Sequence, residues 1–266
     1  MTDRHTGPVP AGFLDHPRPI AFAHRGGASH FAENSWPAFE HAVKLGYAYL
    51  ETDAHATADG QVVAFHDKTL DRVTDAVGRI AELPWEQVAR ARIGGTEPIP
   101  LLADLLGAWP DVRFNIDVKD APVIGPLAEV IERTGTWDRV CVTSFSGRRL
   151  GATRHALARQ AAARPVCMAT APPGIGLIRY GVPARALAGR FTRLSIRCTQ
   201  IPYGMATPRY VRRAHAAGLQ VHVWTVNDPK IMAAMLDLGV DGIMTDQIEA
   251  LRELMISRGQ WNPGAD

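Results

Sequence analysis

The chain alternates short apolar runs with helix signals, and this repetition constrains the fold more than any other feature. We interpret about eight of the runs as principal strands, at residues 20–23, 47–53, 112–118, 139–142, 165–168, 194–196, 219–223 and 240–244. Repeats of a strand followed by a helix require crossover connections, which place neighbouring strands parallel. The strand count and the length of 266 residues together predict an α/β protein that folds as a single (βα)8 barrel of the TIM type.

The last third of the chain carries the clearest helix signals. Thr207-Pro208 opens a helix that Gly218 closes, and Asp228-Pro229 opens another that Gly239 closes. An open doubly wound sheet is the alternative architecture for such repeats. No Gly-x-Gly-x-x-Gly motif follows the first strand, and its absence argues against a dinucleotide-binding sheet of that kind.

Composition sets the expected limits of the barrel. Residues 1–19 are polar and rich in proline, so we predict a flexible N-terminal arm there. The barrel is expected over residues 20–256, and residues 257–266 are expected to form a C-terminal tail.

Two segments interrupt the regular repeat. The apolar run at 61–65 follows a turn at Asp59-Gly60 and is predicted to be an accessory, hairpin-like strand. The segment from Ala171 to Leu187 is rich in Pro and Gly, and we interpret it as a loop with buried apolar anchors. The alternative is a lid or apolar rim that contacts a lipid tail, which would favour lysophospholipids as substrates.

Charge and hydropathy exclude several classes of partner. The formal net charge is +2 without a long basic run, so no nucleic-acid partner is expected. No stretch of ~18 apolar residues predicts a membrane span, although transient contact with a membrane surface stays open. The N-terminus lacks the apolar core of a signal peptide, and Cys141, Cys167 and Cys198 lie in apolar runs that suit buried, reduced thiols. These features favour a cytoplasmic protein, and they leave its oligomeric state undetermined.

Three carboxylates occupy the carboxyl ends of predicted strands. Glu51 and Asp53 are two residues apart on one strand and therefore point the same way, and Asp117 ends the next principal strand. In a barrel these strand ends meet at one mouth. Oxygen ligands without softer donors suit Mg²⁺ or Ca²⁺, so we predict a metal site. The alternative is that the acids form ion pairs with Lys119 and Arg25 without a metal.

Histidines and cations follow strands at the same predicted mouth. His24 and His66 are candidate proton carriers, because imidazole titrates near neutral pH. Arg25 and Lys119 can donate hydrogen bonds to phosphate oxygens. Trp224 ends another strand and offers a flat wall to a substrate, or else packs in the core. His55 and His222 point in suitable directions on their strands, but we favour a structural role for both.

The order and spacing of these residues resemble the glycerophosphodiester phosphodiesterase family over roughly residues 20–255. The motifs that carry the resemblance are His24-Arg25-Gly26, Glu33-Asn34-Ser35, Glu51-Thr52-Asp53, His66-Asp67, Asn115-Ile116-Asp117-Val118-Lys119, Ser144-Phe145, Trp224-Thr225-Val226-Asn227 and Asp241-Gly242-Ile243-x-Thr245-Asp246. The resemblance implies a TIM-type barrel, a divalent cation (Mg²⁺ or Ca²⁺), and hydrolysis of a small glycerophosphodiester to sn-glycerol 3-phosphate and an alcohol.

The resemblance also implies a role for each residue. His24 and His66 become the acid–base pair, which is expected to act through a cyclic phosphate. The metal ligands are Glu51, Asp53 and Asp117, the last standing where the bacterial members commonly have Glu. Arg25 and Lys119 become phosphate contacts, and Trp224 lines the pocket. Two alternatives are a lysophospholipase D-like hydrolase and an inactive barrel that serves as a binding protein, and the intact set of acids and histidines argues against the second.

Overall fold

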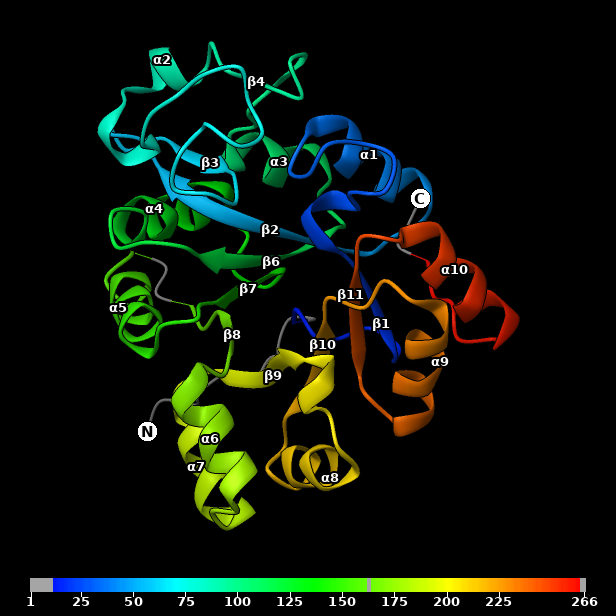
Figure 1. The fold of residues 1–266 in the computed structure, drawn as a ribbon. Helices are drawn as coiled ribbons and strands as arrows, with labels where there is room; N and C mark the ends of the chain where they lie inside the picture. The colour runs from blue at the N-terminus through cyan, green and yellow to red at the C-terminus, as the bar shows by residue number, and fades with distance from the viewer. Residues whose placement is uncertain (1–11, 162–163, 264–266) are drawn as a thin grey trace.

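Eight parallel strands close into a barrel in the computed structural model, which describes residues 12–161 and 164–263. These strands are β1 (Ile20–Ala23), β2 (Tyr49–Ala56), β6 (Arg113–Val118), β7 (Val140–Thr143), β8 (Cys167–Ala169), β9 (Ile196–Pro202), β10 (Gln220–Trp224) and β11 (Gly242–Thr245). Closure is explicit, because β1 pairs with β2 on one side and with β11 on the other (Figure 1). The predicted TIM barrel is confirmed, and the open doubly wound sheet is wrong.

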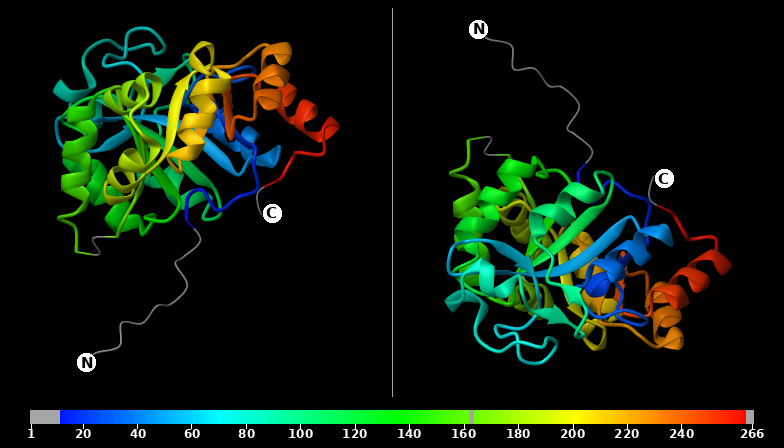
Figure 2. Two further views of the ribbon diagram at one scale, coloured as in Figure 1. Left: turned by 90° about the horizontal axis from the view of Figure 1, so that it is seen from below. Right: turned by 90° about the horizontal axis from the view of Figure 1, so that it is seen from above.

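Helices surround the barrel on its outer side (Figure 2). They are α1 (Trp36–Lys44), α3 (Leu102–Ala108), α4 (Ile124–Thr134), α5 (Gly147–Leu157), α6 (Pro172–Tyr180), α7 (Ala184–Arg193), α8 (Pro208–Ala216), α9 (Pro229–Leu238) and α10 (Ile248–Ser257). The short helix α2 (Trp85–Val88) lies apart from this layer (Figure 1). The predicted caps are present: the side chains of Thr207 and Asp228 accept backbone N–H groups at the starts of α8 and α9. None of the described helices is both long and apolar enough to span a bilayer.

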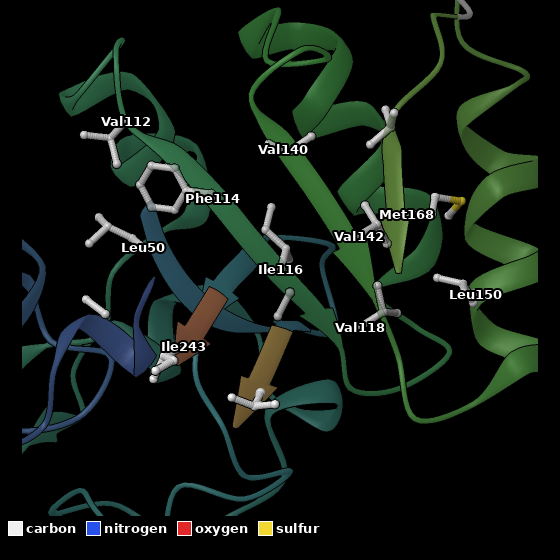
Figure 3. Close-up of a cluster of buried hydrophobic side chains, with 14 of the residues drawn as sticks. Leu50, Val112, Phe114, Ile116, Val118, Val140, Val142, Leu150, Met168 and Ile243 are labelled. Atoms are coloured by element: carbon white, nitrogen blue, oxygen red, sulfur yellow. The ribbon is translucent and has the colours of Figure 1, made fainter. Parts of the chain in front are cut away.

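Alternating side chains along the strands build two separate cores. The outward side chains of β6, such as Phe114 and Ile116, pack with Leu50 and Val142 beneath the helices (Figure 3). Each large side chain buried in this way contributes about 1.5–3 kcal/mol. The inward side chains form a smaller apolar core toward the amino ends of the strands. This alternation leaves the inward positions at the carboxyl ends for polar residues.

The amino end of the barrel is closed by residues that we predicted to be loose. Phe13 is only 2 % exposed, and its ring meets the ring of Tyr49 edge-on at 5.1 Å. The hydroxyl of Tyr49 donates to the carbonyl oxygen of Phe13. Residues 12–19 are therefore packed against the barrel and do not form a flexible arm, because aromatic burial outweighs the effect of the prolines. The part of the predicted arm at 1–11 lies outside the described residues.

The last helix, α10, ends at Ser257, one residue beyond the predicted end of the barrel at 256. The described part of the tail returns to the body, because the ring of Trp261 contacts the ring of Tyr47 at 5.1 Å. This contact fastens the end of the described chain to the barrel.

The three cysteines lie together inside the barrel. Cys141 and Cys198 are buried, Cys167 is partly exposed, and all three are free thiols, as predicted. Their sulfur atoms lie within 4.8 Å of one another. They come from three consecutive strands, so their proximity follows from the inward alternation of β7, β8 and β9.

The segment 171–187 is helical, and our interpretation of it as a plain loop is wrong. Pro172 occupies the first turn of α6, where its missing N–H has no partner to lose. Gly174 is kept small by Thr170, because a Cβ at this glycine would lie 3.1 Å from the Thr170 Cβ. Gly181 has a φ of +89° and ends the helix, and α7 begins at Ala184. In this segment proline starts a helix, and the glycines allow close packing or end the helix.

The other interruption runs from β3 to β5, over residues 62–98, and we call this segment above the barrel the excursion. The predicted accessory strand is confirmed as β3 (Val62–Ala64), which pairs antiparallel with β2. The chain then forms β4 (Arg92–Ile93), β5 (Glu97–Pro98) and the short helix α2 over an apolar cluster of its own before it reaches α3. Figure 1 shows this excursion on the opposite side of the molecule from α7 and α8.

Candidate active site

A cavity of about 560 Å³ lies at the carboxyl ends of the strands. The structure brings all eight predicted site residues to its lining, namely His24, Arg25, Glu51, Asp53, His66, Asp117, Lys119 and Trp224. They come from β2, β6 and β10 and from the turns that follow β1, β3 and β6, so closure of the barrel brings them together. The position agrees with the rule that TIM-barrel enzymes keep their sites at this end.

A tight turn after β1 presents the first two residues. Arg25 has a φ of +52° and Gly26 a φ of +85°, so the chain reverses in the left-handed region directly after the strand. A Cβ at Gly26 would lie 2.9 Å from the backbone nitrogen of Phe39, which leaves no room for a side chain. The turn directs the backbone N–H of Arg25 to Glu51 Oε2 at 3.0 Å.

The acids and Lys119 form a charged floor. Lys119 Nζ lies 2.8 Å from Asp53 Oδ1 and 2.8 Å from Asp117 Oδ2. Burial would raise the pKa of Asp53, but Lys119 and Arg25 outweigh it and lower that pKa. Burial and the neighbouring Asp53 raise the pKa of Glu51 to about 7. The charged floor therefore holds one carboxyl group, that of Glu51, which titrates near neutral pH because burial and the charge of Asp53 outweigh its positive neighbours.

The donor set fits a hard divalent cation. Asp117 Oδ1 is buried and has no hydrogen-bond partner among the described residues, and burial raises the pKa of Asp117 despite Lys119. A cation would satisfy this oxygen and would favour the ionised form of Glu51. The three carboxylates are more widely spread than the cysteine sulfurs, since within residues 12–161 and 164–263 only the sulfurs gather three ligand atoms within 4.8 Å. The predicted ion pairs to Lys119 and Arg25 are also present.

A carboxylate orients each of the two imidazoles. His24 Nδ1 lies 2.6 Å from Asp246 Oδ1, and His66 Nδ1 lies 2.6 Å from Asp67 Oδ1. Both aspartates are held ionised. Burial opposes this at Asp246, but the hydrogen bond and charge of His24, together with Asn227 and Arg25, outweigh it and lower the pKa of Asp246. Arg72 lowers the pKa of Asp67 to about 2. A carboxylate can only accept, so each ring donates from Nδ1 and keeps Nε2 for proton transfer.

Glu51 also acts on the first imidazole. His24 Nε2 is 3.9 Å from Glu51 Oε2. Burial alone would lower the pKa of His24, but Glu51 and Asp246 outweigh it, so the pKa is raised above its ordinary value. The protonated form of His24 is thereby favoured in the absence of other charges.

Sequence reasoning missed three residues that hold the site in place. Asp246 and Asp67 orient the imidazoles, and Asn34 donates from Nδ2 to Asp53 Oδ2 at 3.1 Å while it accepts from the Thr52 hydroxyl at 2.7 Å. A signal existed for each, because all three are short polar residues inside motifs that carry the family resemblance. Their side-chain partners could not be read from spacing alone.

Apolar side chains form another part of the cavity wall. The rings of Trp224 and Phe145 both line the cavity and meet edge-on at 5.4 Å. Ile175 and Tyr180 extend this wall from α6, and Met205 extends it from the turn after β9. The cavity is thus divided between a polar, charged part and an apolar part.

The two ambiguous histidines lie outside the cavity lining. His55 is buried with Nδ1 2.7 Å from Asp120 Oδ2, and its Nε2 donates to the carbonyl oxygen of His66 at 3.2 Å. His222 is buried beside Phe22 at a ring distance of 4.9 Å. The favoured structural role fits both positions.

A TIM barrel whose mouth combines oriented imidazoles, acids and phosphate-type donors defines a barrel hydrolase for anionic substrates. The chain matches the glycerophosphoryl diester phosphodiesterase family over residues 24–250 and belongs to it. The predicted enzyme class, a phosphoric diester hydrolase, is thereby confirmed, and the inactive binding protein loses its support.

Known relatives cover nearly the whole chain. It is 42 % identical over 256 residues to a Mycobacterium tuberculosis protein named probable glycerophosphodiester phosphodiesterase 2, covering 94 % of this chain and 96 % of that protein. It is 27 % identical to the human lysophospholipase D GDPD1, covering 88 % of this chain and 85 % of that one. The fold resembles an Oleispira antarctica phosphodiesterase solved with its product sn-glycerol-3-phosphate, with a TM-score of 0.74 at 21 % identity, over 90 % of this chain and 97 % of that one.

Proposed function

We propose that the protein hydrolyses small glycerophosphodiesters to sn-glycerol 3-phosphate and an alcohol. The observation that carries this proposal is the pair of carboxylate-oriented imidazoles, His24 and His66, on the lining of one cavity with the charged floor. Family membership, the name of the M. tuberculosis relative and the product bound to the O. antarctica enzyme support the same activity.

The proposed metal ligands are Glu51, Asp53 and Asp117, and the ion is Mg²⁺ or Ca²⁺. When bound, such an ion stabilises negative charge on a phosphate oxygen and eases deprotonation of a nearby hydroxyl. Arg25 and Lys119 lie next to these acids and donate to the remaining phosphate oxygens. Trp224 and Phe145 bound the side of the cavity where the rest of the substrate lies.

The two imidazoles carry protons in opposite directions. One takes the proton of the glycerol 2-hydroxyl while its oxygen bonds to phosphorus, and the other protonates the alcohol oxygen as its bond to phosphorus breaks. The product of this step is a cyclic phosphate. Water then attacks phosphorus with the roles of the two imidazoles reversed, and the ring opens to sn-glycerol 3-phosphate. Direct attack by water on the diester is the competing route, and trapping of a cyclic phosphate distinguishes the two.

Substitution of the imidazoles tests the proposal. His24→Ala and His66→Ala should each lower the release of glycerol 3-phosphate from glycerophosphocholine by about 10²–10⁴-fold. His155→Ala is the matched control, because His155 is exposed on α5 away from the cavity lining. EDTA should abolish activity, and Mg²⁺ or Ca²⁺ should restore it. Wild-type rates in both histidine variants, with circular dichroism showing an intact fold, would contradict the assignment.

A second candidate substrate class is lysophospholipids. The apolar wall from α6, with Ile175 and Tyr180, is the observation that favours it, since a deacylated substrate has no chain to place there. The human relative is named a lysophospholipase D. Hydrolysis of lysophosphatidylcholine should be weakened by Ile175→Asp more than hydrolysis of glycerophosphocholine. Cleavage of the deacylated compound alone rules this candidate out.

We also propose that the enzyme works in the cytoplasm. Three free thiols within 4.8 Å of one another persist best in a reducing compartment. Cell fractionation with the activity assay tests this location.

A further inference from the structure

One stretch of the chain is basic without any acidic residue. Residues 139–227 contain 14 arginines and no lysine, aspartate or glutamate. The remainder of the chain carries 15 basic and 27 acidic residues. The overall net charge of +2 therefore conceals a strong division of charge between two parts of the molecule. The arginines are dispersed, which is why they form no basic run.

These arginines lie on one side of the barrel. The stretch forms α5, α6, α7 and α8, and α8 contacts both α6 and α7 (Figure 1). We call the arginine-bearing surface of α5 to α8 the basic face. Its exposed members in and around these helices are Arg148, Arg154, Arg159, Arg164, Arg179, Arg185, Arg190, Arg193, Arg197, Arg209 and Arg212. Arginine ion pairs within the described residues all belong to other parts of the chain. The positive charge of the basic face is thus available to an outside anion.

A hollow of about 350 Å³ opens in the basic face, between the α6–α7 connection and α8. Arg209, Arg212 and Arg213 line it together with the apolar side chains of Val182 and Leu187. Arg213 donates from a terminal nitrogen to the carbonyl oxygen of Arg179 at 2.8 Å, which fixes its guanidinium beside Gly181. Several guanidinium groups around one small hollow suit a phosphate group, whose oxygens accept paired N–H donors.

Apolar side chains stand at the end of α6, between this hollow and the catalytic cavity. Tyr180 is 84 % exposed and lines the catalytic cavity, while Val182 is 36 % exposed and lines the hollow. An exposed aromatic ring and a valine beside clustered arginines are typical of a surface that enters the headgroup region of a bilayer. A duplex nucleic acid would be bound through its phosphates and would leave these apolar groups in water.

We propose that the basic face docks on an anionic phospholipid surface, with a lipid phosphate in the arginine-lined hollow and with Tyr180 and Val182 in the interface. Docking places the mouth of the catalytic cavity against the lipid, because α6 contributes to both. The proposal rests on the proposed function only for what the enzyme does there. Anionic surfaces attract arginines over roughly one Debye length, so docking is expected to be reversible and sensitive to salt.

Vesicle sedimentation of the purified full chain tests the proposal. The protein should pellet with phosphatidylcholine vesicles that contain phosphatidylglycerol, and should stay in solution with pure phosphatidylcholine or at high salt. The double variant Arg209→Glu and Arg212→Glu should lower the bound fraction about tenfold or more while it hydrolyses soluble glycerophosphocholine normally, because neither residue lines the catalytic cavity. Tyr180→Ala should weaken binding without changing its dependence on anionic lipid.

A matched control separates the basic face from net charge alone. The double variant Arg79→Glu and Arg90→Glu changes the total charge equally, but on the excursion at the opposite side of the molecule (Figure 1), and should bind vesicles normally. Equal loss in both double variants overturns the proposal, as does equal binding to neutral vesicles. Binding to duplex DNA without binding to vesicles overturns it in favour of a nucleic-acid partner. Absence of hydrolysis with intact vesicle binding would instead count against the proposed function.

Discussion

Individual residues set the direction of proton transfer in this site. His24 and His66 each meet an ionised aspartate through Nδ1 at 2.6 Å, so the reactive nitrogen of each ring is defined before substrate arrives. His24 and Asp246 are separated by 222 positions, and they meet because β1 pairs with β11. The orientation of a catalytic side chain is therefore a property of barrel closure.

Replacement of the orienting carboxylate should disable His24 without removing it. We expect Asp246→Asn to lower kcat by about 10²–10⁴-fold with little change in KM, because the amide can present a donor to Nδ1 and stabilise the wrong tautomer. Loss of the negative charge should also lower the pKa of His24 and shift the pH profile of kcat/KM toward acid. Asp237→Asn, at an exposed carboxylate paired with Arg258, is the control. An unchanged pH profile would argue that Asp246 has only a structural role.

A buried histidine should make the stability depend on pH. Burial lowers the pKa of His222 to about 4, and its Nδ1 has no hydrogen-bond partner among the described residues. The unfolded chain binds this proton near the ordinary value of ~6.5 and the folded protein only near 4, so stability is complete above pH ~6.5 and falls as the pH drops toward 4. The loss from this residue amounts to about 3 kcal/mol.

Denaturant unfolding at several pH values checks this expectation. The difference in unfolding free energy between the wild type and His222→Gln should change with pH between ~6.5 and ~4 and be constant above that range. Both proteins contain the same other titratable groups, so the contributions of those groups cancel in this difference. A constant difference across the whole range would show that His222 takes up its proton at the same pH in the folded and unfolded states, so that burial does not lower its pKa.

At the scale of elements, the turn after β1 is the most constrained segment of the site. Gly26→Ala should destabilise the protein by about 2–4 kcal/mol, because the left-handed φ and the 2.9 Å approach to Phe39 both oppose a Cβ. Activity should fall as well, since this turn directs Arg25 to Glu51. The control, Gly151→Ala, lies in α5 with open space around a new Cβ and should stabilise by about 0.5–1 kcal/mol. Thermal or urea unfolding that gives both variants the same sign would contradict this account.

Sequence patterns predict secondary structure well where side chains alternate with one clear period, as along the strands. The inward parity of Glu51, Asp53 and Asp117 was evident because strands alternate with a period of two, and all three reach the cavity. The predicted loop at 171–187 is wrong because proline and glycine do not always break a helix: Pro172 starts α6 and Gly181 ends it. Composition alone does not distinguish a residue that ends a helix from one that prevents it.

At the scale of the whole molecule, the two ends of the barrel have separate tasks. Phe13 seals the amino end from a segment outside the repeat, and the catalytic cavity lies at the other end. Phe13→Ala should cost about 3–5 kcal/mol in the free energy of unfolding and leave kcat/KM unchanged. Val77→Ala, at a side chain that is 77 % exposed, should change stability by less than about 0.5 kcal/mol. A large fall in kcat/KM for Phe13→Ala at full folding would show that the two ends are coupled.

The distribution of charge over the molecule does not follow from its net charge. The net charge of +2 argues against a nucleic-acid partner but conceals the acid-free stretch at 139–227, which acids elsewhere offset. The stretch can be counted in the sequence, but its position on one side of the barrel follows only from the packing of α6, α7 and α8. The same holds for Asp67 and Asp246, whose partners depend on three-dimensional neighbours.

The ammonium of Lys119, set between Asp53 and Asp117, has one further consequence. The protein supplies an internal counter-ion to two of its proposed ligands, so these acids do not depend on an outside ion to remain folded side by side. Removal of divalent ions should abolish the activity of such an enzyme without unfolding it. A cell short of magnesium or calcium would then contain folded, inactive enzyme that becomes active again as soon as the ion returns.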